Sequence, residues 1–503
     1  MAAPKLDPAL EAWLTAGAGM GAPADKVIAT ATAWVFLYPE RVLKLKKPVD
    51  FGFLDFTTLE KRCWAVEREL AFNSEAAPDI YRTVRAIVRM AGGGFALDGA
   101  GELVEQVLEM RRFDETCVLS EHPTDVDGDF AEALGRAVAR FHAHAQVGEA
   151  GGGSAGTGYV VGSNAGLFRE LPEALGPGIE PVIAATDAAL AQAARLLDLR
   201  GAQGFVRRCH GDLHLGNIVV EGGEAVLFDC IEFNDRLSEI DVLYDLAFLL
   251  MDLEFRGQDA AANRVLNGWL DEAARGFGEG LWEGLAALPL YQSMRAGVRA
   301  HVCAHAGDAA TARLYLRAAA AHLVPGAPRL VAVGGLSGTG KTSFGRLLAP
   351  RLGAAPGAVI LRSDEIRKRL WGCAPRERLP DEAYGPGSSE LVYEAMLEAA
   401  RACLAAGRAV ILDAVFLRPE ERANAQALAA ALSVPFHGAW LEAPADLLRE
   451  RVSGRVGDAS DADVPVLEGQ LARDPGEIDW ARYDARDLPV AAAALLASLG
   501  APR

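Results

Sequence analysis

Hydrophobic and polar positions divide the chain into two parts with different rhythms. From residue 330 onward, short apolar runs alternate with segments that have the spacing of amphipathic helices. An apolar run bounded by turn residues is typical of a buried parallel strand, and its regular alternation with helices predicts a doubly wound α/β domain. The predicted elements cover residues 330–333, 342–352, 358–362, 364–371, 388–406, 408–413, 419–432, 436–441 and 444–452.

The part before residue 330 starts with strand-like segments and continues with helical ones, which predicts an α+β fold. Trp34–Leu37 and Arg41–Leu45 flank the turn Tyr38-Pro39-Glu40, as in a hairpin. A glycine cluster at 151–158 predicts a flexible loop. The remaining predicted strands are Thr83–Val88 and Leu103–Met110, and the predicted helices cover 55–76, 128–146, 182–199 and most of 238–323.

The boundary between the two parts falls at Val324–Pro328, where two prolines and a glycine end the helical pattern. We therefore expect a domain over 1–324, with a small lobe over about 1–110 and a helical large lobe over about 111–324. A linker at 325–329 leads to a second domain over 330–503.

Composition places the chain among globular proteins and disfavours nucleic acid as a partner. Of its 503 residues, 51% are hydrophobic and 23% are charged, and the net charge is −18. That acidic balance disfavours bulk binding to a nucleic-acid backbone. The seven cysteines form no C-x-x-C pair, and neither a signal peptide nor a long uninterrupted apolar stretch is apparent. We expect a cytoplasmic protein without a membrane segment that acts on small molecules; its oligomeric state is left open.

The segment His210–Asn217 combines the residue types of a kinase-type catalytic loop. Phosphoryl transfer needs a group that orients or deprotonates the acceptor and ligands for the metal that neutralises the phosphates. Asp212 is the candidate for the group that orients or deprotonates the acceptor, and Asn217, five residues later, is the candidate for a metal ligand. Two short strand-like segments follow around the turn Glu221-Gly222-Gly223, and a hairpin there brings Asn217 and Asp229 to one end as Mg²⁺ ligands.

This segment resembles the aminoglycoside phosphotransferase family, whose loop reads HGDxxxxN and is followed by a metal-binding aspartate. The resemblance extends over residues 27–320. It implies that Lys44 is the strand lysine that contacts ATP, that Glu69 is its helix partner, and that Glu109 and Met110 begin the hinge for adenine. Lys46 and Lys47 are alternative candidates for the strand lysine, and Glu67 is an alternative candidate for its helix partner. Chance occurrence of turn-forming residues and an inactive kinase-like fold remain the alternatives.

A phosphate-binding loop opens the second part. The sequence Gly335-x-x-x-x-Gly340-Lys341-Thr342 follows a predicted strand and precedes a predicted helix, the context that a P-loop requires. Glycines let backbone N–H groups approach the phosphates of ATP, and the helix N-terminus favours their charge. Lys341 is expected to contact the β- and γ-phosphates and Thr342 to bind Mg²⁺. The nucleotide-binding residues of the loop are Gly335, Ser337, Gly338, Thr339, Gly340, Lys341, Thr342 and Ser343.

Further charged residues follow the strands of this part. Asp364 comes after the second strand and is a candidate to accept a proton from a substrate hydroxyl, and Arg367 can hold an anionic group. Asp413 follows the third strand, where it serves as a metal ligand or, alternatively, as a helix cap. Arg451 and Arg455 are expected to stabilise the transferred phosphoryl group, with exposed i, i+4 ion pairs as the alternative.

Together with Ser460-Asp461-Ala462-Asp463, these residues resemble small P-loop kinases related to gluconate kinase, zeta toxins and the kinase domain of polynucleotide kinase, over 329–503. The two constellations predict a bifunctional kinase that uses ATP and Mg²⁺. Each domain is expected to phosphorylate a hydroxyl of a small metabolite such as a sugar or amino sugar. Two alternatives stay open: one domain senses nucleotide and regulates the other, or the P-loop domain acts on a nucleotide sugar or a nucleic-acid end.

Overall fold

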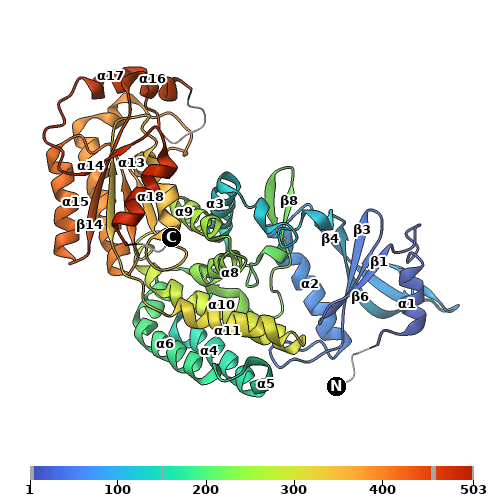
Figure 1. Cartoon of the computed structure of the whole chain (residues 1–503). Coiled ribbons are helices and arrows are strands. Elements are labelled where there is room, and N and C mark those ends of the chain that lie inside the picture. The colour runs from blue at the N-terminus through green and yellow to red at the C-terminus, as the bar shows by residue number, and fades with distance from the viewer. Residues whose placement is uncertain (1–4, 150, 455–459, 501–503) are drawn as a thin grey trace. The chain divides into compact units, whose positions relative to one another are not determined.

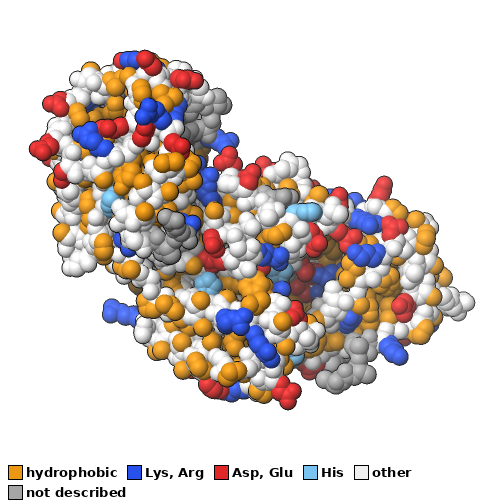
Figure 2. Space-filling view, in the orientation of Figure 1, with side chains coloured by type: hydrophobic (Ala, Val, Ile, Leu, Met, Phe, Trp, Pro, Cys, Tyr) orange, Lys and Arg blue, Asp and Glu red, His pale blue; other side chains and the backbone are white. Residues whose placement is uncertain are grey.

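The computed structural model describes residues 5–149, 151–454 and 460–500. Its internal contacts form two compact units. The first contains Met1–Asp125, Ala145–Gly152 and Gly204–Asp245, and the second contains Val126–His144, Gly153–Gln203 and Leu246–Arg503. The sequence-based domain limits, with a linker at 325–329, stay a prediction. On the face shown in Figure 2, basic side chains are interspersed with acidic ones.

The first unit is built on an antiparallel six-stranded sheet with the order β1-β2-β3-β6-β4-β5. The predicted hairpin of 34–45 is present, with Val35 opposite Lys44. Helix α2 (Leu59–Ala76) begins at the cap Thr58 and packs against strands β4 and β6. The strands are β1 (Lys26–Ala29), β2 (Ala33–Leu37), β3 (Arg41–Lys46), β4 (Tyr81–Arg89), β5 (Phe95–Leu97) and β6 (Glu102–Arg111), and α1 is Pro8–Thr15.

The rest of the first unit carries the segment with the catalytic-loop pattern. Strands β8 (Ile218–Glu221) and β9 (Glu224–Leu227) form the expected hairpin, with Ile218 opposite Leu227. The residues just before β8 and just after β9 therefore lie at the same end. A second pair of strands, β7 (Val206–Arg208) and β10 (Glu239–Asp241), flanks this segment, and α7 (Asp235–Ser238) precedes β10.

The second unit begins with helices that belong to the sequence before residue 330. They are α3 (Gly128–His144), α4 (Gly153–Glu170), α5 (Pro172–Leu175), α6 (Ile179–Ala202), α9 (Asp259–Gly276), α10 (Leu288–His305) and α11 (Ala309–His322), with α8 (Val242–Phe255) running from one unit into the other. Helices α3 and α9 pack closely together, as do α10 and α11. Among the described residues, no helix is long and apolar enough to cross a membrane.

The glycine cluster at 151–158 was predicted to be a loop, and this prediction is wrong for most of it. Helix α4 starts at Gly153 and contains Gly156 and Gly158. Glycine costs about 1 kcal/mol in a helix interior, but α4 buries Val160, Val161 and Phe168 on the side that faces its neighbours α6 and α10. Tertiary packing thus outweighs the local propensity.

The rest of the second unit is the predicted α/β domain. Its five parallel strands have the order β12-β13-β11-β14-β15, and Figure 1 shows α14 and α15 on one side of the sheet and α18 on the other. Phe344 and Leu348 of α12 pack with Leu495 of α18 on a core of strand residues. The elements are β11 (Leu330–Gly334), α12 (Lys341–Leu348), β12 (Val359–Arg362), α13 (Ser363–Leu370), α14 (Pro386–Ala405), β13 (Val410–Asp413), α15 (Pro419–Ala431), β14 (Phe436–Glu442), α16 (Ala445–Ser453), α17 (Val464–Leu471), β15 (Ala481–Asp484) and α18 (Leu488–Ser498).

Candidate active sites

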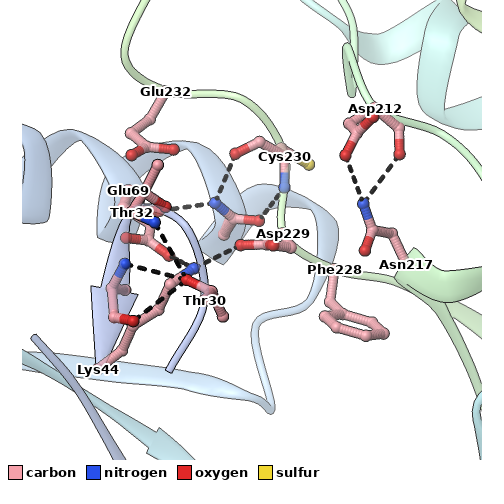
Figure 3. Close-up of polar contacts among 12 residues, drawn as sticks. Thr30, Thr32, Lys44, Glu69, Asp212, Asn217, Phe228, Asp229, Cys230 and Glu232 are labelled. Carbon is pink, nitrogen blue, oxygen red and sulfur yellow. Dashed lines mark hydrogen bonds and ion pairs between the residues drawn. The ribbon is translucent and has the colours of Figure 1, made fainter. Parts of the chain in front are cut away.

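Lys44 on β3 joins two carboxylates from different parts of the first unit. Its Nζ lies 2.6 Å from Oε1 of Glu69 on α2 and 2.6 Å from Oδ1 of Asp229 after β9, as Figure 3 shows. Burial by itself lowers the pKa of Lys44, but the charges of Asp229 and Glu69 outweigh burial and raise that pKa well above its ordinary value. Lys44 therefore stays protonated and can contact a phosphate.

The rival residues lie differently. Lys46 also reaches Glu69, with Nζ 2.6 Å from Oε2, but its other partner is the buried Glu232 at 2.5 Å. Nζ of Lys47 donates to the carbonyl of Thr30. Glu67 is exposed and accepts a hydrogen bond from Gln106 at 3.4 Å. Of the three lysines, Lys44 is the one that the structure brings together with both Glu69 and Asp229.

Asp229 has a strained backbone that neighbouring side chains hold in place. Its φ is 64°, a left-handed value that costs a non-glycine residue of order 1–3 kcal/mol. The Asp229 N–H donates to the hydroxyl of Tyr81 at 2.9 Å, and the next N–H, that of Cys230, donates to Asn73 at 2.7 Å. Sequence reasoning missed Tyr81 and Asn73, because neither belongs to a motif.

Asp212 and Asn217 of the predicted catalytic loop contact each other directly. Nδ2 of Asn217 donates to the carbonyl of Asp212 at 2.9 Å and to its carboxylate at 3.2 Å. Asn217 immediately precedes β8 and Asp229 is the second residue after β9, so their oxygens lie at one end of the hairpin. Carboxylate and amide oxygens are suitable Mg²⁺ ligands, and the side chain of Asp229 is 44% exposed. The residues present therefore fit the metal.

Asp245, at the fourth position of α8, holds the start of this loop. Its buried carboxylate accepts the N–H groups of His210 at 3.1 Å and Gly211 at 2.8 Å. Asp241, expected on the same helix, lies in β10 and caps α8 through the N–H of Leu243. Gly211 has a φ of 82°, and a Cβ there would lie 2.9 Å from the carbonyl oxygen of Leu237. The loop thus requires glycine where a protein kinase has arginine.

His210 organises the loop as a neutral imidazole. Burial lowers its pKa, so the ring is uncharged at neutral pH. Nε2 lies 2.8 Å from the carbonyl of Phe228, and Nδ1 accepts the Asp212 N–H at 3.3 Å. In this tautomer, the ring connects the catalytic loop to the residue before Asp229.

The proposed adenine hinge lies at the end of β6. The buried carboxylate of Glu109 is 2.7 Å from Arg85 and 3.4 Å from Arg41, so its side chain is committed to the sheet. Met110 is buried as well. A hinge role for Glu109 and Met110 therefore depends on their backbone, and it stays a prediction.

The P-loop lies between β11 and α12 with the conformation that its glycines permit. Gly335, Gly338 and Gly340 have φ values of 142°, 86° and 81°. A Cβ on Gly335 would lie 2.7 Å from the carbonyl oxygen of Leu441, and one on Gly338 would lie 2.9 Å from that of Leu448. Larger residues would therefore push the loop away from the phosphate position.

Side chains of the P-loop make contacts that fit a bound nucleotide and metal. Nζ of Lys341 donates to the loop carbonyls of Gly335 at 3.0 Å and Leu336 at 3.2 Å. The hydroxyl of Thr342 donates to Oδ2 of Asp413 at 2.6 Å. Two oxygen donors are thus already together at the end of β13, as an Mg²⁺ site requires. Thr339 bonds within the loop, while Ser337 donates its N–H to Gln470 at 2.8 Å, a contact that the sequence did not predict.

A cavity of about 770 Å³ extends from the P-loop over α13. Asp364 is the second residue of this helix, and burial, together with the nearby charge of Asp413, raises its pKa. A carboxylate with a raised pKa suits proton acceptance near neutral pH. The lining includes Gly338, Lys341, Thr342, Ser343, Asp364, Arg367, Tyr384, Asp413, Arg418, Arg451, Asp461 and Gln470.

The arginines of this cavity have unequal surroundings. Arg367 is 8% exposed, donates to the carbonyl of Ala383 at 2.6 Å and lies over the ring of Tyr384, while its Nε has no hydrogen-bond partner within the described ranges. Arg451 reaches the carbonyl of Ala485 at 3.0 Å and that of Gly338, in the P-loop, at 3.4 Å. Arg455 lies outside the described residues.

Comparisons with known proteins agree with the resemblances predicted for both halves of the chain. Residues 70–288 match the phosphotransferase enzyme family, and residues 330–474 match a family described as AAA domain. The chain is 31% identical over 477 residues to the uncharacterized proteins Rv2004c of Mycobacterium tuberculosis and Mb2027c of Mycobacterium bovis, which covers 90% of each chain. The chain belongs to the family of these mycobacterial proteins. The two family matches confirm both resemblances predicted from the sequence, one for the part before residue 330 and one for the part after it.

Two solved structures are similar to parts of this chain. A glucosamine kinase in complex with glucosamine, ADP and inorganic phosphate is 14% identical, with a TM-score of 0.36, over 60% of this chain and 76% of that one. A gluconokinase from Sinorhizobium meliloti is 23% identical, with a TM-score of 0.24, over 34% of this chain and 93% of that one. From its family matches, the protein is an ATP-dependent phosphotransferase with an alcohol group as acceptor.

Proposed function

We propose that the protein is a bifunctional kinase whose two halves each transfer the γ-phosphoryl group of ATP to a hydroxyl of a small metabolite. The observation that carries this proposal is that each half has its own set of the same side-chain types: a lysine, oxygen-bearing side chains suited to a metal, and a further carboxylate. Lys44, Asp229 and Asp212 are the set of the first half, and Lys341, Thr342 with Asp413, and Asp364 that of the second.

In the kinase-like half, Lys44 contacts the phosphates of ATP and Glu69 holds that lysine in place. Asp212 accepts the proton of the acceptor hydroxyl, while the bond from Asn217 restricts its carboxylate. Asn217 and Asp229 are the ligands for Mg²⁺, which neutralises phosphate charge when it is bound.

In the P-loop half, backbone N–H groups of residues 335–343 surround the phosphates, and Lys341 leaves its loop carbonyls to contact them. Thr342 and Asp413 hold the metal, and Asp364 accepts the acceptor's proton. Arg367 binds an anionic group of the acceptor, because it lines the same cavity as Asp364. Arg451, with Arg455, stabilises charge on the transferred group.

The decisive experiment removes the two proposed sites separately. Asp212→Asn, Lys341→Ala and the double variant are compared with the parent chain for phosphate transfer from labelled ATP to a panel of sugars, sugar acids and amino alcohols. Two sites predict two acceptor profiles, each lost in one single variant and both lost in the double variant.

Three other outcomes lead to different functions. If Asp212→Asn changes no transfer while nucleotide still binds, the first half is a sensor rather than a kinase. If Lys341→Ala changes nothing, the second half is the sensor. Transfer to a nucleotide sugar or to a 5′-hydroxyl oligonucleotide, in place of small metabolites, supports the corresponding alternative for the P-loop half.

A further inference from the structure

Strand β12 lies at the edge of the parallel sheet, and helix α9 covers that edge with side-chain amides. Nδ2 of Asn263 donates to the carbonyl of Ala358 at 3.0 Å, and Oδ1 of Asn267 accepts the N–H of Ile360 at 2.7 Å. The two asparagines are four residues apart on α9 and are buried. They satisfy backbone groups that another strand would otherwise pair. A helix within the phosphotransferase match is thus built onto the P-loop sheet.

The helix that follows β12 is held by charges from the same region. Glu365, next to Asp364, is 3% exposed, and its Oε1 lies 2.7 Å from Nη2 of Arg136 on α3. Arg275 on α9 lies 3.5 Å from Oε2 of Glu365 and donates to the carbonyl of Cys373, just beyond the end of α13, at 2.6 Å. Both ends of α13 are therefore connected to α3 and α9, and Figure 1 shows α13 beside α9.

Arg136 is the main cation of this arrangement, because four carboxylates lie within 4 Å of its guanidinium, those of Glu132, Asp271, Glu272 and Glu365. Asp271 on α9 lies 3.3 Å from the same Nη2 that contacts Glu365. Burial, followed by the charge of Glu365, raises the pKa of Asp271 to about 7. Arg136→Gln would remove this shared positive charge and leave Glu365 with Arg275 and Arg362, each at 3.5 Å. Without Arg136, Glu365 and Asp271 would repel each other.

The helix of the P-loop is tied to α3 in the same way. Arg346 on α12 forms an ion pair with Glu132, one turn before Arg136 on α3. Lys341 begins α12 and Asp364 is the second residue of α13, so two helices that carry proposed site residues are anchored to one helix of the kinase-like half.

We propose that Arg136 and Asn267 are positioning residues for the P-loop kinase. They hold β12 and α13 where Asp364 meets the acceptor hydroxyl, so the working unit of the second kinase includes α3 and α9 of the first half. This inference rests on the proposed role of Asp364. Neither residue is among those that line the cavity over α13.

The test uses the full chain with Asp212→Asn, which silences the first site. Arg136→Gln is compared with Arg140→Gln, a matched control on the same helix whose side chain is 52% exposed and lies 3.7 Å from Glu272. Amide hydrogen exchange of residues 363–373 is measured together with the affinity for a fluorescent ADP analogue. Arg136→Gln is expected to reduce protection of this segment by about tenfold or more, as a local loss of about 1.4 kcal/mol would. ADP affinity and the control are expected to stay within about twofold of the parent.

Phosphate transfer to the acceptor panel supplies a second readout. Arg136→Gln is expected to lower kcat at the P-loop site by about tenfold or more without weakening ADP binding, because the P-loop itself is intact. Asn267→Ala, which leaves every charge in place, is expected to show the same pattern to a smaller degree. Asn267→Ala also tests the inference if the Arg136→Gln variant does not fold.

Several results would overturn the inference. Unchanged exchange of 363–373 and unchanged kcat in both variants would do so. A parallel loss of ADP affinity, or global unfolding of both variants while Arg140→Gln stays folded, would show that these contacts support general stability instead. Asp364→Asn separates the two proposals: if that variant keeps transfer, the role of Asp364 is wrong; if only Arg136→Gln and Asn267→Ala keep it, the positioning role alone is wrong.

Discussion

Lys44 and Asp229 form an ion pair at 2.6 Å, although 185 positions separate them in the chain. The contact joins the antiparallel sheet to the residue that follows the β8–β9 hairpin. Asp229 also has a positive φ. The hydroxyl of Tyr81 accepts its N–H, and Asn73 accepts the N–H of the next residue, Cys230. The lysine and the proposed metal ligand are therefore set relative to each other by contacts within the protein.

Replacing Lys44 by methionine tests this relationship. Loss of a hydrogen bond to a charged group is worth about 1.5–3 kcal/mol, which corresponds to about a 10- to 100-fold fall in kcat/KM at the first site. The measurement is phosphate transfer in a Lys341→Ala background. Lys47→Met is the matched control, because that side chain bonds to Thr30 and not to Glu69 or Asp229. Equal losses in both variants would contradict a specific role for Lys44.

The contact between Thr342 and Asp413 predicts that Mg²⁺ binding in the P-loop half depends on the Thr342 hydroxyl. Thr342→Val removes the oxygen that bonds to Asp413 at 2.6 Å but keeps the branched shape. We expect the Mg²⁺ concentration for half-maximal transfer to rise by about tenfold or more, whereas Thr342→Ser keeps it near the parent value. Magnesium titrations in the Asp212→Asn background measure this, and a Val variant that matches Ser would exclude the hydroxyl as a ligand.

Asp245 is expected to support the catalytic loop rather than the chemistry. In Asp245→Asn, the amide keeps one acceptor oxygen but places N–H groups opposite the N–H of His210 or Gly211. A buried donor without an acceptor costs about 1–3 kcal/mol, so the free energy of unfolding in urea should fall by that amount. Asp235→Asn, whose side chain is 46% exposed and pairs with Arg68, should change it by less than about 0.5 kcal/mol. A stable Asp245→Asn protein would refute the anchoring role.

Glu254 on α8 makes the stability of the protein depend on pH. Burial raises its pKa from 4.5 to about 8, with the charge of Arg408 opposing this effect and that of Asp259 adding to it. The folded protein therefore binds the proton more tightly than the unfolded chain does. This contribution is fully present below about pH 4.5 and is lost as pH rises toward about 8, at up to about 1.4 kcal/mol per pH unit.

Glu254→Gln removes that titration, with the Gln292 hydrogen bond at 2.6 Å still available to the side-chain oxygen. We expect a higher Tm than the parent at pH 8–9 and no gain at pH 5. The exposed Glu279→Gln is the control. Thermal unfolding across this pH range is the measurement, and parallel Tm curves for the parent and Glu254→Gln would contradict the prediction.

The parts of the fold that follow from local pattern were predictable. The β8–β9 hairpin, the P-loop and the strand–helix alternation after residue 330 depend on neighbouring residues, and the structure has them close to the expected positions. The glycine cluster failed because packing of α4 against α6 and α10 offsets its poor helix propensity. The choice between Lys44 and Lys46 was equally hard, since alternate residues of a strand share a face and both lysines reach Glu69.

Motif spacing thus identified the phosphate loop, the candidate aspartates and the phosphotransferase chemistry, because each depends on residues close together in the chain. Contacts across long separations could not be identified in this way: Tyr81 at the backbone of Asp229, Gln470 at the P-loop, and Arg136 against Glu365. No motif marks them, since such pairs form only when distant segments fold against each other. The folded chain alone brings α9 of the kinase-like half onto the edge of the P-loop sheet and α3 against α12 and α13, where buried charges and backbone groups require partners.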